Sequence, residues 1–78
     1  MNQDLKIIIK MDCEGAEYEI VENLSKENLL KSVDIVIIEW HDLGAKVIED
    51  YLLLNNFTIF SRSLGPVSGL IYGKNEIN

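Results

Sequence analysis

The sequence predicts an α/β fold with elements in the order β-α-β-α-β-β, and three observations support this prediction. Residues 5–11 and 33–40 are apolar at consecutive positions, which is typical of parallel strands buried on both faces. Each run is followed by a segment with apolar residues at helical spacing. Two strand-like runs separated by turn residues close the chain and predict a terminal antiparallel hairpin. We therefore expect a sheet of mostly parallel strands in a single domain over residues 1–78.

Two helices are expected to connect the parallel strands. The first covers residues 15–24, where the apolar positions fall on one helical face. Residues 25–31 predict a second short turn, for which Ser25 can act as the N-cap. The second helix covers residues 45–54 and ends before two asparagines. Each helix would carry the chain back to start the next parallel strand.

The last third of the chain has the pattern of an edge strand followed by a returning strand. Residues 57–62 alternate as expected of a strand near the edge of a sheet. Residues 63–66 include Gly and Pro and predict a turn. Residues 69–73 predict a short strand that returns antiparallel, and residues 75–78 predict a frayed tail.

One face of the predicted sheet has no helix to cover it. Two right-handed crossovers that lead in the same direction place both helices on the same face. The strands nevertheless carry large apolar residues on both faces, such as Ile37 on one side and Ile38 on the other. An uncovered apolar face marks an interface or a missing piece. We therefore expect a homo-oligomer, or completion by a missing N-terminal half.

Composition excludes several classes of protein. The net charge is −6, and the seven Lys and Arg residues are scattered, which argues against nucleic-acid binding. No apolar run approaches the ~20 residues that span a bilayer, and no signal peptide is recognisable, so we expect a cytoplasmic protein that does not bind membranes. A single Cys and a single His exclude a closed Cys/His zinc site within one chain.

Acidic side chains and the histidine cluster at the ends of the two buried strands. Asp12 and Glu14 follow the first strand, and Glu39 and His41 end the second. The carboxyl ends of parallel strands are where open α/β sheets bind ligands, and neighbouring strands lie ~4.8 Å apart. These four side chains are therefore expected to converge on one cleft. His41 is the best general base among them, because its ordinary pKa is near ~6.5.

Other interpretations of the same residues stay open. Glu14 and Glu17 could simply stabilise the positive end of the first helix, Glu39 could pair with a lysine, and His41 could be a solvated loop residue. A divalent-metal site formed by Asp12, Glu14 and Glu39 is a further alternative, because hard cations prefer oxygen ligands.

Two apolar residues near the cluster are expected to be structural. Cys13 is predicted to be a small buried residue rather than a nucleophile, because no basic partner lies near it in sequence. Trp40 is predicted to be a core anchor, and a place in the wall of a binding pocket is the alternative.

Two motifs resemble those of a known family. Segment 10–19, KMDCEGAEYE, resembles the Lys-Ile-Asp-x-Glu-Gly-x-Glu signature of the FkbM-type methyltransferases. Segment 37–41, IIEWH, resembles the Glu-x-His at the end of that family's next strand. Met11 and Cys13 depart from the aliphatic residues that are more usual there, but both are apolar. The resemblance covers essentially the whole chain, and the closing hairpin is similar to the end of a class I methyltransferase sheet.

The resemblance implies a Rossmann-like fold and an enzyme that uses S-adenosylmethionine. It implies O-methyl transfer to a sugar or other small hydroxylated metabolite, with the acceptor side of the active site formed by Asp12, Glu14, Glu39 and His41. We assign no cofactor-binding residue and no metal ligand.

Family members bind the cofactor through an earlier Gly-rich strand-helix turn, and no Gly-x-Gly pattern occurs in this sequence. We therefore expect a partial Rossmann-like sheet, the C-terminal portion of a methyltransferase, that is inactive alone. The alternative is a non-catalytic α/β remnant that self-associates or completes a partner.

Overall fold

The computed structural model describes residues 6–77 and confirms the α/β class. Its elements are β1 (Ile8–Met11), α1 (Glu17–Lys26), the short 3₁₀ helix η1 (Leu30–Ser32), β2 (Ile35–His41), α2 (Lys46–Leu54), β3 (Phe57–Gly65) and β4 (Ser68–Asn75). This is the predicted order of strands and α-helices. The predicted first strand began at residue 5 and the predicted tail ended at residue 78, and both of these residues lie outside the described part of the chain.

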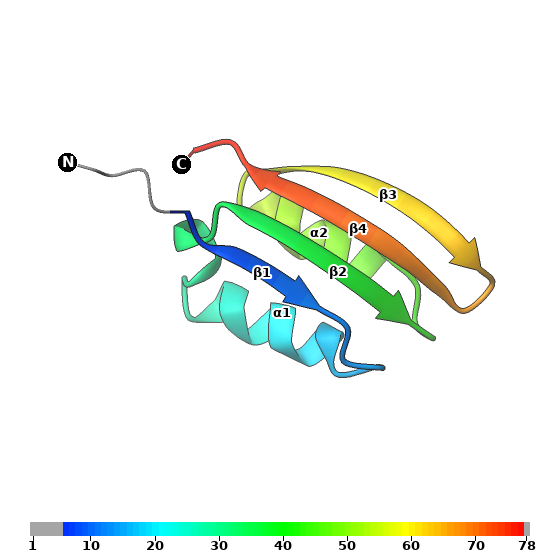
Figure 1. Cartoon of the computed structure of the whole chain (residues 1–78). Coiled ribbons are helices and arrows are strands. Elements are labelled where there is room, and N and C mark those ends of the chain that lie inside the picture. Colours follow the sequence, from blue (N-terminus) through cyan, green and yellow to red (C-terminus); the bar gives the residue numbers. More distant parts are fainter. Residues whose placement is uncertain (1–5, 78) are drawn as a thin grey trace.

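The four described strands form one mixed sheet in the order β1-β2-β4-β3 (Figure 1). β1 pairs parallel with β2, and β4 pairs antiparallel with both β2 and β3. β1, β2 and β3 thus run in one direction, but only one of the neighbouring pairs is parallel. The prediction of a mostly parallel sheet is wrong in this respect, because β4 enters between β2 and β3 and separates them. The terminal hairpin and the edge position of β3 are confirmed.

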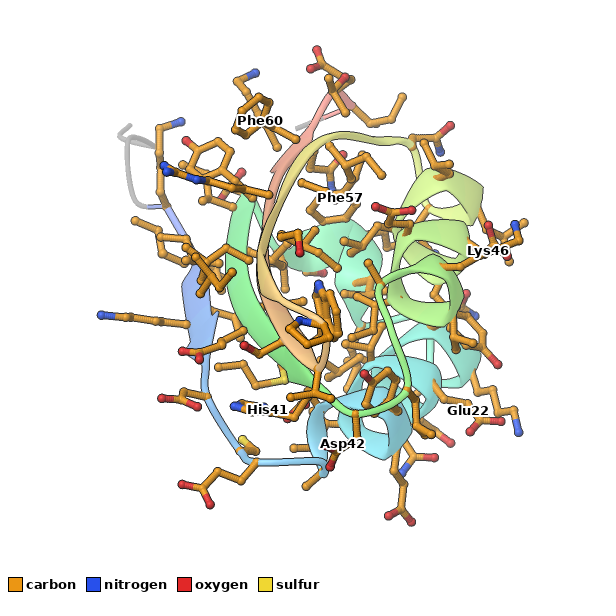
Figure 2. The ribbon with its side chains drawn as sticks, turned by 90° about the vertical axis from the view of Figure 1, so that its right-hand side faces the viewer. Glu22, His41, Asp42, Lys46, Phe57 and Phe60 are labelled. Atoms are coloured by element: carbon orange, nitrogen blue, oxygen red, sulfur yellow. The ribbon has the colours of Figure 1, made fainter. Side chains whose placement is uncertain are left out.

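Both α-helices cover the same face of the sheet (Figures 1 and 2), as predicted. α1 packs against β2 and α2, and α2 packs against β3. Apolar residues from the helices and from alternate strand positions form one core between these layers. Its buried members are Met11, Tyr18, Val21, Leu30, Val33, Val36, Ile38, Trp40, Ile48, Leu52, Phe57 and Ile71. Trp40 is therefore a core residue, as predicted.

The opposite face of the sheet is open to solvent. Phe57 and Phe60 lie on opposite sides of β3 (Figure 2), and Phe57 is buried whereas Phe60 is 69% exposed. Partly or largely exposed apolar side chains continue across the other strands of this face. We call this surface the open face; its apolar members are Ile8, Ile35, Ile37, Phe60, Leu70 and Tyr72. Among the described residues the open face is uncovered, which confirms that feature of the prediction.

Predictions about three single residues are wrong. Ser25 lies inside α1 rather than capping a separate turn, because the helix continues to Lys26. Cys13 is exposed, since it lies in the turn after β1 and not in the strand. Asn75 is not part of a frayed tail: it ends β4 with 2% exposure, and its side-chain amide donates to the carbonyl oxygens of Val33 (2.9 Å) and Lys31 (3.2 Å).

β3 extends beyond its predicted end. It includes Ser63 and Gly65, which were predicted to belong to the turn, and the pairing register shifts between these two residues. The hairpin turn therefore consists of Pro66 and Val67 alone.

Neither α-helix has the length and apolar character that crossing a membrane requires, and no such helix occurs in residues 6–77.

Candidate active site

The parallel pairing of β1 with β2 brings the predicted site residues together. Met11 pairs with Ile38, so Asp12 and Glu39 follow side by side at the carboxyl ends of the two strands. His41 is the last residue of β2, and its Nε2 lies 3.6 Å from both Asp12 Oδ1 and Glu39 Oε2. These distances exceed those of N–H···O hydrogen bonds. The imidazole Nε2 therefore faces two carboxylates without being hydrogen-bonded to either.

A third carboxylate, that of Glu17, holds the other side of the imidazole. Glu17 Oε2 accepts a hydrogen bond from the His41 backbone N–H (2.8 Å) and lies within hydrogen-bond distance of His41 Nδ1 (3.0 Å). Its Oε1 accepts a hydrogen bond from the Gly15 backbone N–H (3.0 Å). Glu17 has 0% exposure, although it is a charged residue in the first turn of α1. Fully buried glutamates are rare unless they are paired, and this one has partners on both oxygens.

Sequence reasoning considered that Glu17 could stabilise the helix end, and did not include it among the site residues. A signal was available in its spacing. Glu17 precedes Ile20, Val21 and Leu24 by three, four and seven positions, so it lies on the apolar stripe of α1. A carboxylate on a buried stripe requires partners, and a nearby histidine would have been the first candidate.

The electrostatics of the pair favour its charged form. Burial alone would raise the pKa of Glu17, but hydrogen bonds from Gly15 and His41 outweigh it, and the pKa lies below its ordinary value. The hydrogen bond to Glu17 raises the pKa of His41 against the opposing effect of desolvation, and the charges of Glu17, Glu39 and Asp12 add to the rise. Both shifts favour an imidazolium beside a carboxylate.

Tyr18, the next residue of α1, fixes the loop that follows β2. Its hydroxyl lies 2.6 Å from the His41 carbonyl oxygen and 2.9 Å from the Gly44 carbonyl oxygen, and it accepts a hydrogen bond from the Leu43 N–H (3.1 Å). The Asp42 N–H donates to the carbonyl oxygen of Val67 (2.7 Å), which ties the same loop to the β3–β4 turn. The backbone around His41 is thus held from the helix layer and from the hairpin.

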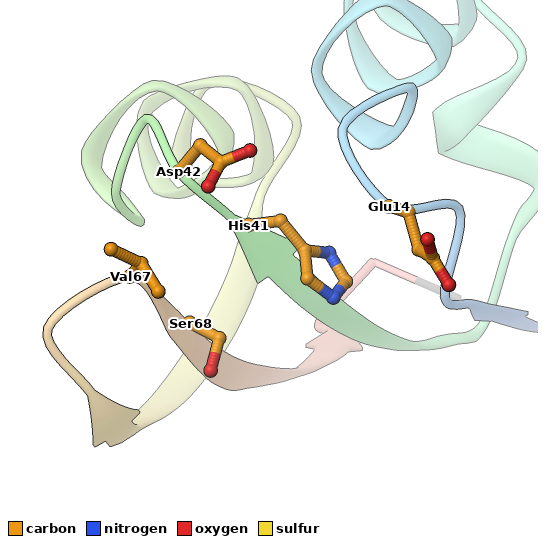
Figure 3. Close-up of a pocket in the computed structure, with 5 residues that line it drawn as sticks. All are labelled: Glu14, His41, Asp42, Val67 and Ser68. Carbon is orange, nitrogen blue, oxygen red and sulfur yellow. The ribbon is translucent and has the colours of Figure 1, made fainter.

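Glu14 lies across a cavity from this cluster. The cavity has a volume of about 410 Å³ and is lined by Glu14, His41, Asp42, Val67 and Ser68 (Figure 3). Glu14 has a φ of 50°, followed by Gly15 with a φ of 113°, a conformation that glycine adopts without strain. The Glu14 side chain extends from this turn, across the cavity from the imidazole (Figure 3).

The structure therefore places Asp12, Glu39 and His41 in one cluster and Glu14 at the rim of the same cavity. Asp12, Glu39 and His41 each offer a polar atom within 4.8 Å of the others, whereas the metal site considered from sequence had Glu14 in place of His41. Exposed acidic groups gather without an ion on many protein surfaces, so we assign no metal to this cluster.

The family model described as "Methyltransferase FkbM domain" matches residues 3–59, which is more than half of the chain. The chain belongs to the FkbM methyltransferase domain family. The match includes Asp12, Glu14, Glu17, Glu39 and His41, and it ends before Val67 and Ser68. No curated protein and no solved structure matches the chain.

The family suggests S-adenosylmethionine as the cofactor, and the described residues around the cavity do not fit it. The cavity is lined mainly by carboxylates and the imidazole, and the glycines at the site, Gly15 and Gly44, stand singly in two different turns. These residues do not form the glycine-rich turn expected around S-adenosylmethionine.

Proposed function

We propose that this chain forms the acceptor-binding side of an S-adenosylmethionine-dependent O-methyltransferase that acts on a sugar or another small hydroxylated metabolite. The observation that carries the proposal is the arrangement of His41. His41 lines a cavity together with Glu14 and Asp42, one of its ring nitrogens lies against the buried Glu17, and the other lies 3.6 Å from the carboxylates of Asp12 and Glu39. Membership of the FkbM methyltransferase domain family supports methyl transfer as the reaction.

The proposed role of His41 is that of a general base. A hydroxyl oxygen gains a bond to carbon in methyl transfer, and its proton must leave as that bond forms. A hydroxyl in the cavity would give this proton to His41 Nε2, and the Glu17 carboxylate would stabilise the imidazolium that results. S-Adenosylmethionine, when bound, supplies an electrophilic methyl group.

The carboxylates of Asp12, Glu14 and Glu39 are proposed to bind and orient the acceptor. Ionised carboxylates accept hydrogen bonds only, so they suit a molecule with several hydroxyl donors. Holding such a molecule at the carboxyl ends of β1 and β2 would align one hydroxyl with the methyl donor, and alignment supplies much of the catalysis in such a displacement. The same carboxylates would repel acidic acceptors.

We further propose that a segment with a glycine-rich turn completes the Rossmann-like sheet and binds the cofactor. The open face of the sheet supports this proposal, because a two-sided α/β sheet needs a layer on each face. On this proposal the 78-residue chain alone has no methyltransferase activity.

Two measurements test the proposed function. Calorimetric titration of the chain with S-adenosylhomocysteine is expected to show no saturable binding. The chain is then placed at the matching position of an active FkbM-family enzyme, and methyl transfer from labelled S-adenosylmethionine is measured. We expect activity, with a loss of about 100-fold or more for His41→Asn.

Asp50→Asn is the matched control for the chimera, because it removes an exposed carboxylate of α2 that is ion-paired with Lys46, away from the cavity. Equal activity of His41→Asn and Asp50→Asn would contradict the assignment of the base. A folded chimera without any activity would favour the non-catalytic remnant.

A further inference from the structure

We infer that Glu17 is the positioning residue of this site: its buried carboxylate fixes the ring orientation of His41 and keeps the imidazole proton on Nδ1, so that Nε2 is the nitrogen presented to the cavity. Glu17 is not among the residues that line the cavity, and the candidate site residue to which its carboxylate is hydrogen-bonded is His41. Its effect on an acceptor would therefore pass through the imidazole.

The hydrogen bonds of Glu17 determine which ring nitrogen of His41 carries the proton. An ionised carboxylate has no proton to donate and can only accept. Two backbone N–H groups, those of Gly15 and His41, already point at its oxygens, which favours the ionised state. At 3.0 Å, His41 Nδ1 must therefore be the donor. Neutral His41 then carries its proton on Nδ1 and a lone pair on Nε2.

The position of Glu17 in the fold keeps this hydrogen bond in place. Its side chain is fully buried in the first turn of α1, and both of its oxygens have hydrogen-bond partners. Through Gly15 it holds the turn that carries Asp12 and Glu14, and through His41 it holds the end of β2. One carboxylate thus fixes the two halves of the site relative to each other.

The other charged groups around His41 act on the opposite side of the ring. Asp12, after β1, and Glu39, in β2, approach Nε2 at 3.6 Å, and Glu14 and Asp42 line the cavity. Each of these can change the charge of the imidazole, but none is bonded to Nδ1. Glu17 is the carboxylate that can select the tautomer, so substitutions on the two sides of the ring have separable effects.

Nuclear magnetic resonance of the ring nitrogens tests the inference directly, because His41 is the single histidine of the chain. ¹⁵N shifts of the neutral imidazole report which nitrogen bears the proton. In the full chain we expect the Nδ1–H tautomer, with a slowly exchanging ring N–H. In Glu17→Gln we expect loss of this preference and a lower pKa of His41, because a neutral amide replaces the acceptor-only carboxylate.

Two matched variants serve as controls. Glu39→Gln removes a charge on the Nε2 side and is expected to keep the Nδ1–H tautomer. Glu19→Gln removes an exposed charge from the same turn of α1 and is expected to leave both the tautomer and the pKa of His41 unchanged. A folded Glu17→Gln protein with the tautomer of the unsubstituted chain would overturn the inference.

If Glu17→Gln does not fold, the tautomer of His41 in the unsubstituted chain tests the inference. A neutral His41 that carries its proton on Nε2 overturns the inference, and one that carries it on Nδ1 supports it. The inference rests on the proposed function only in treating Nε2 as the atom that meets an acceptor. An inactive chimera with the Nδ1–H tautomer would therefore refute the function alone, and an active one with the Nε2–H tautomer would refute the role of Glu17 alone.

Discussion

Glu17 and His41 make the stability of this fold depend on pH in a defined window. The pKa of Glu17 lies below its ordinary value of 4.5 in the folded chain, and the pKa of His41 lies above its ordinary value of 6.5. The Glu17 contribution is present above pH 4.5 and is lost as the pH falls through its lowered pKa. The His41 contribution is present below pH 6.5 and is lost as the pH rises through its raised pKa.

The pair is therefore expected to contribute most between pH 4.5 and 6.5. Urea unfolding across this range and on both sides of it measures the effect. The unsubstituted chain should lose stability as the pH rises above 6.5, His41→Gln should not show this decline, and Glu19→Gln should retain it. Parallel stability curves for the His41→Gln protein and the unsubstituted chain above pH 6.5 would count against the pair.

The hydroxyl of Tyr18 is expected to stabilise the loop after β2. Tyr18→Phe leaves the Leu43 N–H and two carbonyl oxygens without the partner they share, which should cost about 1–3 kcal/mol of unfolding free energy. Hydrogen exchange of the Leu43 amide should accelerate at the same time. Tyr72→Phe is the matched control, since Tyr72 lies 46% exposed on the open face. Equal stability losses in the two variants would show that the hydroxyl network contributes nothing specific.

At the residue scale, sequence reasoning identified the side chains that surround His41 on the cavity side and missed the one on the buried side. Asp12, Glu39 and His41 were predictable because strand ends in a parallel pair lie together. The role of Glu17 depends on which face of α1 its first residues occupy. Glutamates are almost always exposed, so the sequence offered little reason to expect this one to be buried. Cys13 was misjudged for the opposite reason, since an apolar residue in a turn need not be buried.

At the scale of elements, the place of β4 between β2 and β3 depends on glycines. Gly69 and Gly73 occupy the helix-facing side of β4. A Cβ atom at Gly73 would lie 2.8 Å from Val36 Cγ2, and one at Gly69 would lie 2.6 Å from Trp40 Nε1. The large side chains of β2 thus use the space that a larger residue on β4 would occupy. A strand with such gaps fits beside a strand with large apolar residues.

This requirement predicts a position-dependent effect of alanine. Gly69→Ala places a Cβ against Trp40 and 2.7 Å from the Arg62 carbonyl oxygen, a backbone atom that cannot easily move. We expect a destabilisation of about 1–3 kcal/mol in urea unfolding. Gly65→Ala, in the same hairpin, meets no atom within 4 Å and should change the stability by about 0.5 kcal/mol or less. A Gly69→Ala protein as stable as Gly65→Ala would show that β2 and β4 can move apart.

The elements themselves were largely predictable, and their pairing was not. Apolar periodicity placed the strands and both α-helices within a few residues of their observed bounds, because local burial patterns determine it. Contacts between distant parts of the chain determine which strand lies beside β2. The hairpin of β3 and β4 could pair with β2 through either of its two strands. The spacing of the glycines on β4 is the sequence feature that favours β4 in this position.

At the scale of the whole molecule, the main feature is the open face, an apolar surface that no other layer covers within the described residues. Its apolar side chains continue across neighbouring strands: Ile37 pairs with Tyr72, and Tyr72 pairs with Phe60. Both edges of the sheet, β1 and β3, also lack a neighbouring strand within the described residues. Continuous exposed apolar surface of this kind drives association with another surface.

In the absence of another covering layer, we expect two copies of this chain to associate through their open faces. Sedimentation velocity over a range of concentrations should show reversible self-association. The double variant Phe60→Glu and Tyr72→Glu introduces two charges per chain on neighbouring strands of the face, and charges that lose water without a partner oppose the contact strongly. It should therefore sediment as a monomer. Leu54→Glu is the control, because Leu54 is 74% exposed but belongs to α2 on the other side of the sheet. A compact monomer at every concentration of the unsubstituted chain would contradict the expectation, and dissociation by Leu54→Glu as well would place the contact on the helical layer.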